Sequence, residues 1–186
     1  MKSLLIISLT FLSITISSQD LKDNQLPYYE IPEQPERYTA GTVASRMMDG
    51  LGFRYYWATE GLKSNDLEFK ASESGRTSAE TIDHILGLSS FILNSVSSDK
   101  SRTNEALLSF EEKRKQTLLN IKEASDILRN MDDVSQFDND KFPFWNIING
   151  PISDALWHCG QVVMLRRASG NSFNSKVSVF TGTVRE

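Results

Sequence analysis

The sequence predicts an all-α protein whose centre is a four-helix bundle over residues 39–170. Four segments place apolar residues at steps of three and four, the spacing that gives a helix one apolar face. Polar or proline-rich stretches separate these segments, and the chain shows neither an internal repeat nor a convincing sheet pattern. Because the connection after the first helix is long, crossover connections fit the pattern as well as simple up-and-down ones.

Residues 1–18 have the pattern of a signal peptide. A basic residue near the start precedes an apolar run over residues 4–16, and two small serines follow this run. The run is short for a membrane span, and small residues are what a signal peptidase requires; an uncleaved membrane anchor is the alternative. We therefore expect an exported protein, periplasmic or secreted, with no stable membrane span once the segment is removed near Gln19.

Composition restricts the classes of fold and partner. The remaining ~168 residues are enough for one domain with a full core. The formal net charge is −4 and no basic stripe is present, which argues against nucleic acid as a partner. The only cysteine is Cys159, so an internal disulfide is excluded. Stability must therefore come from packing, either alone or with help from a bound metal.

Residues 19–38 contain three prolines and are predicted to form an irregular arm, either mobile or packed on the bundle surface. The first helix is predicted over residues 39–63. Its apolar positions are Val43, Met47, Leu51, Tyr55, Ala58 and Leu62. Gly50 and Gly52 cost this helix about 1 kcal/mol each relative to alanine, which is tolerated where close packing requires a glycine. A polar loop is predicted to follow.

The second helix is predicted over residues 77–96. Its start has the capping-box spacing, Thr77 followed by Glu80. The third helix is predicted over residues 103–131. Its inner positions are Leu107, Phe110, Arg114, Leu118, Ile121, Ser125 and Leu128. The opposite face of this helix is charged and predicted to be solvated.

The fourth helix is predicted to begin at Pro151, a residue that suits a first helical position, and to end near Gly170. Arg166 and Arg167 are expected to complement the negative end of its dipole. The aromatic segment before it is expected to pack on the bundle. Residues 171–186 alternate as a strand does but have no evident partner strand, so an extended tail along the bundle is expected.

The two histidines, His84 and His158, indicate a candidate metal site. Asp154 lies four residues before His158, so the carboxylate and the imidazole share one helix face about 6 Å apart along the axis. If His84 faces this pair from the second helix, the three residues form a two-His, one-carboxylate site with open positions. The alternative is an acid that stabilises the helix dipole and forms an ion pair with His158.

The segment GPISDALWHCGQVVMLRRASGN resembles the last helix of the DinB-like metal-binding bundle family, which includes YfiT-type hydrolases. In that family a His-x-x-x-His pair precedes a Gly-Gln run, and here Asp154, His158, Gly160 and Gln161 occupy these positions. SAETIDHILGLSSFI resembles the helix that contributes the remaining histidine, here His84. GLGFRYYWATEGL resembles the aromatic first helix of some members. The resemblance covers residues 40–170 and leaves out the arm and the tail.

The resemblance implies one divalent metal bound by His84, Asp154 and His158. Aspartate stands where the family has its first histidine, which makes the site more negative and harder. Such a donor set accepts zinc, nickel, iron or manganese. A metal also removes the cost of burying an unpaired carboxylate.

Further residues are candidates for a supporting role. Glu60 is a candidate general base or acid beside the metal ligands, with a solvated residue as the alternative. Gln161 is expected either to hydrogen-bond a water on the metal or to satisfy a helix neighbour. Glu80 is preferred as a capping residue, and Cys159 as core packing. The aromatic group is expected to be core. It consists of Tyr55, Tyr56, Trp57, Trp145 and Trp157.

Two functions remain open at this point. One is a metal-dependent hydrolase or transferase that acts on a small-molecule substrate, because relatives of the family include hydrolases and thiol-cofactor-dependent transferases and isomerases. Export disfavours the thiol-cofactor version, since such thiols are mainly cytoplasmic. The other is a non-catalytic metal-binding or stress-related module of the same fold. A homodimer is also expected, because bundles of this type often associate through exposed helix faces.

Overall fold

The computed structural model describes residues 25–99 and 107–186, and it confirms the all-α class. Within these ranges the long helices are α2 (Ala40–Thr59), α4 (Ser78–Val96), α5 (Phe110–Arg129) and α7 (Ser153–Ala168). The short elements are α3 (Ser64–Glu68), η2 (Ser135–Phe137), α6 (Phe144–Ile147), η3 (Ile148–Ile152), β1 (Val177–Ser178) and β2 (Thr183–Val184). The expected signal peptide and the first residues of the arm lie outside the described residues.

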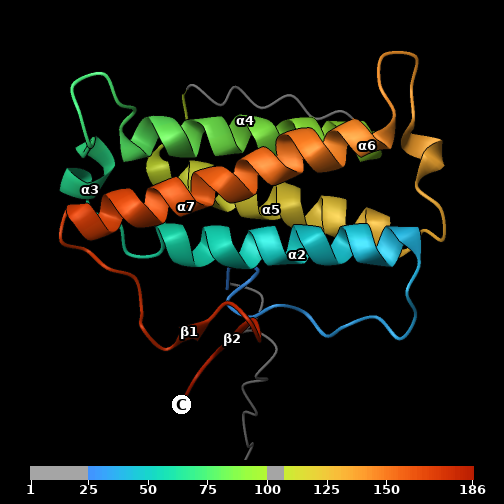
Figure 1. Cartoon of the computed structure of the whole chain (residues 1–186), viewed down its shortest axis with the longest axis horizontal. Coiled ribbons are helices and arrows are strands. Elements are labelled where there is room, and N and C mark those ends of the chain that lie inside the picture. Colours follow the sequence, from blue (N-terminus) through green and yellow to red (C-terminus); the bar gives the residue numbers. More distant parts are fainter. Residues whose placement is uncertain (1–24, 100–106) are drawn as a thin grey trace, which may run out of the picture.

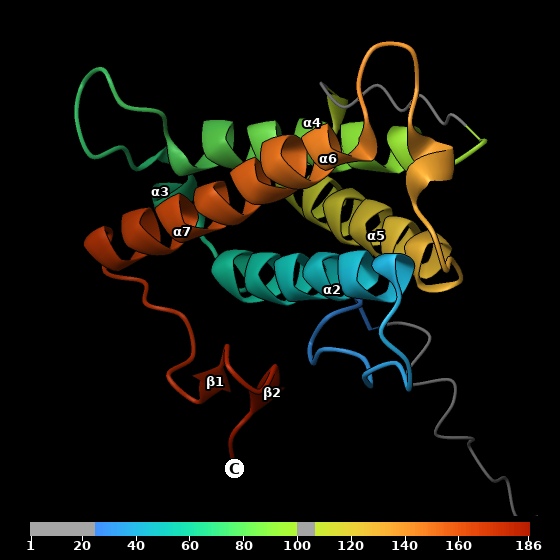
Figure 2. The same cartoon turned by 45° about the vertical axis from the view of Figure 1, so that its right-hand side comes forward.

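The long helices pack as a closed ring of neighbours, α2 with α5, α5 with α4, α4 with α7 and α7 with α2 (Figures 1 and 2). Side chains from all of these helices meet in one core. Its largest fully buried members include Met48, Leu51, Phe53, Tyr55, Ile82, Ile85, Leu86, Leu118, Ile121 and Leu128. Most apolar positions read from the sequence therefore face this core, as helix amphipathicity requires. Val43 is an exception at 48% exposed, and α2 ends at Thr59 rather than near the predicted residue 63.

Capping boxes start three of the long helices. The Thr77–Glu80 box predicted from the sequence is present, and Thr39 with Thr42 forms a second one. A third box, Ser109 with Glu112, starts α5 at Phe110, so the predicted start near residue 103 is wrong. Leu107, expected on the inner stripe, lies before the helix and is 81% exposed. The Ser-x-x-Glu spacing at Ser109 is the signal that would have placed this start.

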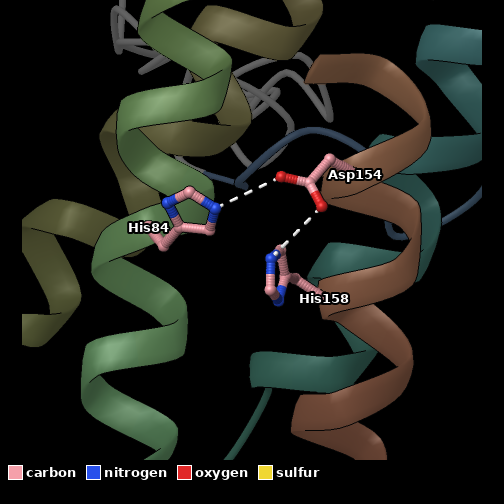
Figure 3. Close-up of side chains that lie close together, drawn as sticks. All are labelled: His84, Asp154 and His158. Atoms are coloured by element: carbon pink, nitrogen blue, oxygen red, sulfur yellow. Dashed lines mark hydrogen bonds and ion pairs between the residues drawn. The ribbon is translucent and has the colours of Figure 1, made fainter. Parts of the chain in front are cut away.

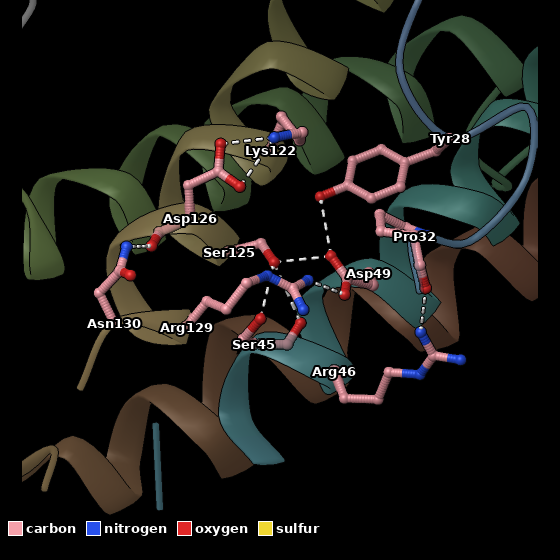
Figure 4. A network of polar contacts seen from close by, with 10 residues as sticks. All are labelled: Tyr28, Pro32, Ser45, Arg46, Asp49, Lys122, Ser125, Asp126, Arg129 and Asn130. Carbon is pink, nitrogen blue, oxygen red and sulfur yellow. Dashed lines mark hydrogen bonds and ion pairs between the residues drawn. The ribbon is translucent and has the colours of Figure 1, made fainter. Parts of the chain in front are cut away.

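From residue 25 onward the described part of the arm packs against α2. The ring of Tyr28 is buried over Gly52, where an added Cβ would lie only 2.3 Å from a ring carbon. The Tyr28 hydroxyl donates to the buried carboxylate of Asp49, which also accepts from Ser125 and forms an ion pair with Arg129 (Figure 4). Close packing of the Tyr28 ring thus requires a glycine at position 52. Of the two outcomes expected for the arm, mobile or packed on the bundle surface, its described part shows the packed one.

Two further connections differ from the prediction. Residues 63–78 contain the short helix α3 rather than an uninterrupted loop. Helical structure also begins at Phe144 and passes through the π-turn η3, where Gly150 has non-helical dihedral angles, before α7 starts at Ser153. Pro151 therefore lies inside a kinked helical segment and does not open a new helix. A kink at a Gly-Pro pair is expected, because proline lacks the amide that would continue the ladder.

Two short strands within the tail pair with each other. β1 pairs with β2 in an antiparallel hairpin, with Val177 opposite Val184. Gly182 adopts a positive φ of 74°, which glycine tolerates best, and its carbonyl accepts from the Ile31 amide of the arm at 2.9 Å. The expectation of an unpaired extended tail is therefore wrong, and the hairpin packs on the arm.

The C-terminal end of α7 is fixed to the end of α2 by Arg166. This side chain was expected to lie at its own helix terminus, but it is buried and donates to the carbonyls of Trp57 and Ala58 at 2.9 and 3.0 Å. Nearby, the buried carboxylate of Asp66 accepts from Ser169 at 2.5 Å and from the Asn171 amide at 2.6 Å. These contacts join α2, α3 and α7 at one end of the molecule.

Burial alone would raise the pKa of Asp66. Hydrogen bonds from Ser169, from Asn171 and from the Lys63 backbone amide outweigh that effect and hold the pKa below its ordinary value. The ionised carboxylate is therefore the form that the fold stabilises. A group whose pKa is lowered by folding adds stability above its unfolded pKa, and this stability is lost as the pH falls through the folded pKa.

The packing of Tyr28 on Gly52 predicts opposite effects of two glycine substitutions. Gly52→Ala should lower stability and displace the arm, because the new methyl group meets the Tyr28 ring. Gly87→Ala, at an open position of α4, should raise stability by up to about 1 kcal/mol through helix propensity. Urea denaturation measures both effects, and limited proteolysis of the arm reports its release. Equal stabilisation by the two substitutions would contradict the packing.

The lowered pKa of Asp66 predicts a pH-dependent defect in Asp66→Asn. At pH 7 the variant should be about 1–3 kcal/mol less stable, because an amide cannot accept three hydrogen bonds as a carboxylate does. The difference should shrink below about pH 4, where the parent carboxylate begins to protonate. Urea midpoints at pH 7 and pH 3 test this, with the exposed loop residue of Asp140→Asn as control. A pH-independent difference would refute the role of the charge.

Candidate metal centre

His84, Asp154 and His158 converge at the interface between α4 and α7 (Figure 3). His84 Nε2 lies 3.2 Å from Asp154 Oδ2, and His158 Nε2 lies 3.4 Å from Asp154 Oδ1. The two imidazole rings meet edge to face, with their centroids 4.6 Å apart. The carboxylate thus stands between the two histidines, with one oxygen directed at each.

The core packing of both helices explains this convergence. On α4, Ile82, Ile85 and Leu86 turn into the core and leave His84 on the flank that borders α7. On α7, the buried Ala155 and Cys159 each follow a site residue by one position, which rotates the site residue about 100° away from them. The helical repeat then stacks Asp154 and His158 on one strip beside α4.

The candidate donor atoms lie close to one another. One ligand atom from each residue lies within 4.8 Å of the other two. Ligands of a tetrahedral zinc ion, with bonds of about 2.1 Å, are about 3.4 Å apart. Lone pairs on imidazole nitrogen and carboxylate oxygen repel one another at such distances, so a cation or protons must lie between them. The chemistry of the donor set therefore fits a divalent metal.

The site is accessible from solvent on one side. The side chains of His84 and Asp154 are 36% and 44% exposed, whereas that of His158 is 13% exposed. A metal held by these three partly exposed residues would keep room for exogenous ligands. Open positions of this kind distinguish a reactive site from a closed structural one.

Gln161 supports the orientation of His158. Its Oε1 accepts a hydrogen bond from His158 Nδ1 at 2.7 Å, one turn further along α7. With Nδ1 engaged by Gln161, Nε2 is the ring nitrogen that faces Asp154, where it can donate to the carboxylate or, after losing its proton, bind a metal. Metal-binding histidines commonly have such a partner on their other ring nitrogen. Of the two roles expected for Gln161, the contact seen is that with its helix neighbour.

The helix-dipole interpretation of Asp154 accounts for fewer of the contacts. Asp154 does lie in the first turn of α7, but the preceding residues Ile148–Ile152 are already helical in part, and the cap residue Ile152 has helical dihedral angles. The free amides that would attract an acid are therefore fewer than at an isolated helix end. The dipole also offers no reason for the contact of Asp154 with His84. The pair of Asp154 with His158, which this interpretation also expected, is present.

Glu60 is placed apart from these three residues. It caps the C-terminal end of α2, is exposed, and forms an ion pair with the buried Arg114 of α5. None of the hydrogen bonds or ion pairs among the described residues joins Glu60 to His84, Asp154 or His158. Arg114 therefore explains the position of Glu60.

The other residues considered beside the site have structural roles or different surroundings. Glu80 accepts from the Thr77 amide at 2.8 Å, as its capping role requires. Burial raises the pKa of the Cys159 thiol to about 12, which suits core packing and disfavours a nucleophile. Trp145 and Trp157 were expected in the core but are 74% and 72% exposed. Each lies about 200° around its helix from a buried residue, Trp145 from Ile147 and Trp157 from Ala155, which a helical wheel would have shown.

Neither the family models, the curated proteins nor the solved structures with which the chain was compared gave a significant match. No helix within residues 25–99 and 107–186 is both long and apolar enough to cross a membrane.

The contact of Gln161 with His158 predicts that Gln161 affects metal binding without touching the metal. Gln161→Leu should weaken the binding of Zn²⁺ about 10–100-fold, because His158 loses the partner that fixes its tautomer and orientation. Gln161→Glu keeps an acceptor at the same place and should retain binding. Titration calorimetry measures both, with Gln136→Leu, an exposed glutamine of η2, as control. Parental affinity in Gln161→Leu would exclude this positioning role.

Proposed function

We propose that this chain is an exported DinB-like four-helix bundle that binds one divalent metal between α4 and α7. His84, Asp154 and His158 would hold the ion, with Gln161 orienting His158. The observation that carries the proposal is the placement of the Asp154 carboxylate between two imidazoles from two different helices. A bundle interior commonly builds metal sites from facing helices in this way.

The donor set favours metals of intermediate hardness. Two imidazole nitrogens suit zinc, nickel and iron, and the carboxylate extends the range to manganese. Replacement of a histidine by Asp154 lowers the charge of the ligand set by one relative to the three-His pattern that the sequence resembles. The metal–ligand complex would then carry a smaller positive charge, which disfavours anionic ligands compared with a three-His site.

The activity that this arrangement supports best is metal-dependent hydrolysis or group transfer on a small molecule. A divalent metal supplies such chemistry by lowering the pKa of a water and by polarising the bond to be cleaved. The chain contributes an exposed edge at His84 and Asp154 through which a substrate would enter. It also contributes His158, held in one orientation by Gln161.

A non-catalytic metal-binding module is the second candidate, and the position of Glu60 favours it. A hydrolase needs a group that accepts a proton near the metal. Glu60 is instead paired with Arg114, and among the described carboxylates only Asp154 contacts the two histidines. Either function requires the same metal, so metal binding is tested first.

Substitution of the ligands is predicted to abolish metal binding. In the mature protein, His84→Ala, Asp154→Asn and His158→Ala should each weaken Zn²⁺, Ni²⁺ or Mn²⁺ binding at least about 100-fold, since each removes one of three donors. Asp83→Asn, the neighbour of His84 that pairs with Lys113, is the matched control. Equilibrium dialysis with elemental analysis gives the stoichiometry, which should be one. Undiminished binding in both histidine variants would refute the site.

Turnover by the metal-loaded protein separates the two candidates. Chromogenic esters, amides and phosphoesters are suitable substrates, and thiol acceptors test group transfer. Activity that disappears in His84→Ala but persists in Asp83→Asn would support the enzyme. If none of these substrates is turned over while one metal is bound to each chain, the non-catalytic metal-binding module is favoured.

A further inference from the structure

A cavity of about 320 Å³ lies on the other side of α7, between α2, α7 and the C-terminal segment. Its wall is mainly apolar and includes Phe53 of α2, Leu156 and Val163 of α7, and Phe173 and Val179 of the C-terminal segment. Cavities of about 300–1,000 Å³ with mostly apolar walls are typical of small-molecule sites. This one is at the small end of that range.

The cavity is separate from the candidate metal centre, although both use α7. At 100° for each residue, Leu156 and Val163 lie about half a turn around the helix from Asp154 and His158. Cys159 and Gly160 also line the cavity, and an added Cβ at Gly160 would meet no atom within 4 Å. The space beside α7 is therefore open at a position where a side chain would be sterically allowed.

The polar groups of the cavity are cationic. Arg54 and Arg167 line it, and no acidic residue does. Among the described residues neither arginine forms an ion pair. Arg54 donates to its own helix at the Gly50 carbonyl, 3.0 Å away, and the Arg167 guanidinium lies 5.4 Å from the centre of the Phe173 ring. The half-buried Arg54 and the exposed Arg167 thus place two guanidinium groups without a carboxylate partner beside an apolar wall.

We propose that this cavity binds a small organic acid with a compact apolar body. Its carboxylate would pair with Arg54 and Arg167, which present planar, multiply donating groups suited to carboxylates. The hydrocarbon body would lie against Phe53, Leu156 and Val163. The volume selects a medium-length chain or a single ring rather than a long-chain lipid. The proposal does not depend on the metal and is independent of the proposed function.

The test compares octanoate with 1-octanol in calorimetric titrations of the mature protein. The two probes share an apolar chain and differ in the charge of the head group. Octanoate should bind with one site, below the concentration at which it forms micelles, and octanol should bind at least about tenfold more weakly. Equal affinity for the two probes, or octanoate binding only at micellar concentrations, overturns the proposal.

Variants locate the binding. Arg54→Met and Arg167→Met should each weaken octanoate binding about tenfold, and Gly160→Leu should weaken it at least as much by filling the cavity. Arg76→Met, at an exposed loop arginine, and His84→Ala, in the metal centre, should bind octanoate as the parent does. Thermal melting confirms that each variant is folded. If Arg54→Met unfolds, Arg167→Met and Gly160→Leu carry the test, and parental affinity in both overturns it.

Discussion

The buried guanidinium of Arg166 connects α7 to α2, and the positions of both candidate sites depend on this contact. The last carbonyls of a helix have no partner within it and carry the negative end of its dipole. Arg166 reaches from α7 to the carbonyls of Trp57 and Ala58 near the end of α2 and supplies both donors and positive charge. Together with the packing of α7 on α2, this contact sets the register of the two helices. Because α7 also packs on α4, this register decides which residues of α7 face His84.

A second buried charge, on Asp49, joins α2 to α5 and to the arm. Asp49 of α2 is fully buried, and its carboxylate is satisfied by Arg129 and Ser125 of α5 and by Tyr28 of the arm (Figure 4). A buried carboxylate without these partners would be strongly destabilising, so the three donors must be present together. The arm is thus part of the bundle rather than an appendage, and it provides the surface on which the C-terminal hairpin packs through Ile31.

Local patterns predicted the helices, and tertiary packing decided the features that were missed. The Thr77–Glu80 box and the stripes of α2, α4 and α5 follow from spacing alone, which is why the all-α class was predicted correctly. The clustering of His84, Asp154 and His158 was also predictable, because the Asp154–His158 spacing places two of them together and only one other histidine exists. Arg166 was not, since a basic residue near a helix end looks the same whether it serves its own helix or another. The packing of the hairpin on the arm and the cavity likewise depend on distant segments meeting.

Helix α7 is only weakly amphipathic because its different faces have different surroundings. One strip meets α4 and carries Asp154 and His158, the opposite strip borders the cavity toward α2, and Trp157 and Met164 remain exposed. Gly160 is the clearest departure from a stable helix, since glycine costs about 1 kcal/mol relative to alanine in a helix interior. No atom lies close enough to require a glycine there. Gly87 of α4 also has no close neighbour, but Gly160 lines the cavity, and the open space beside it is what a ligand there would need.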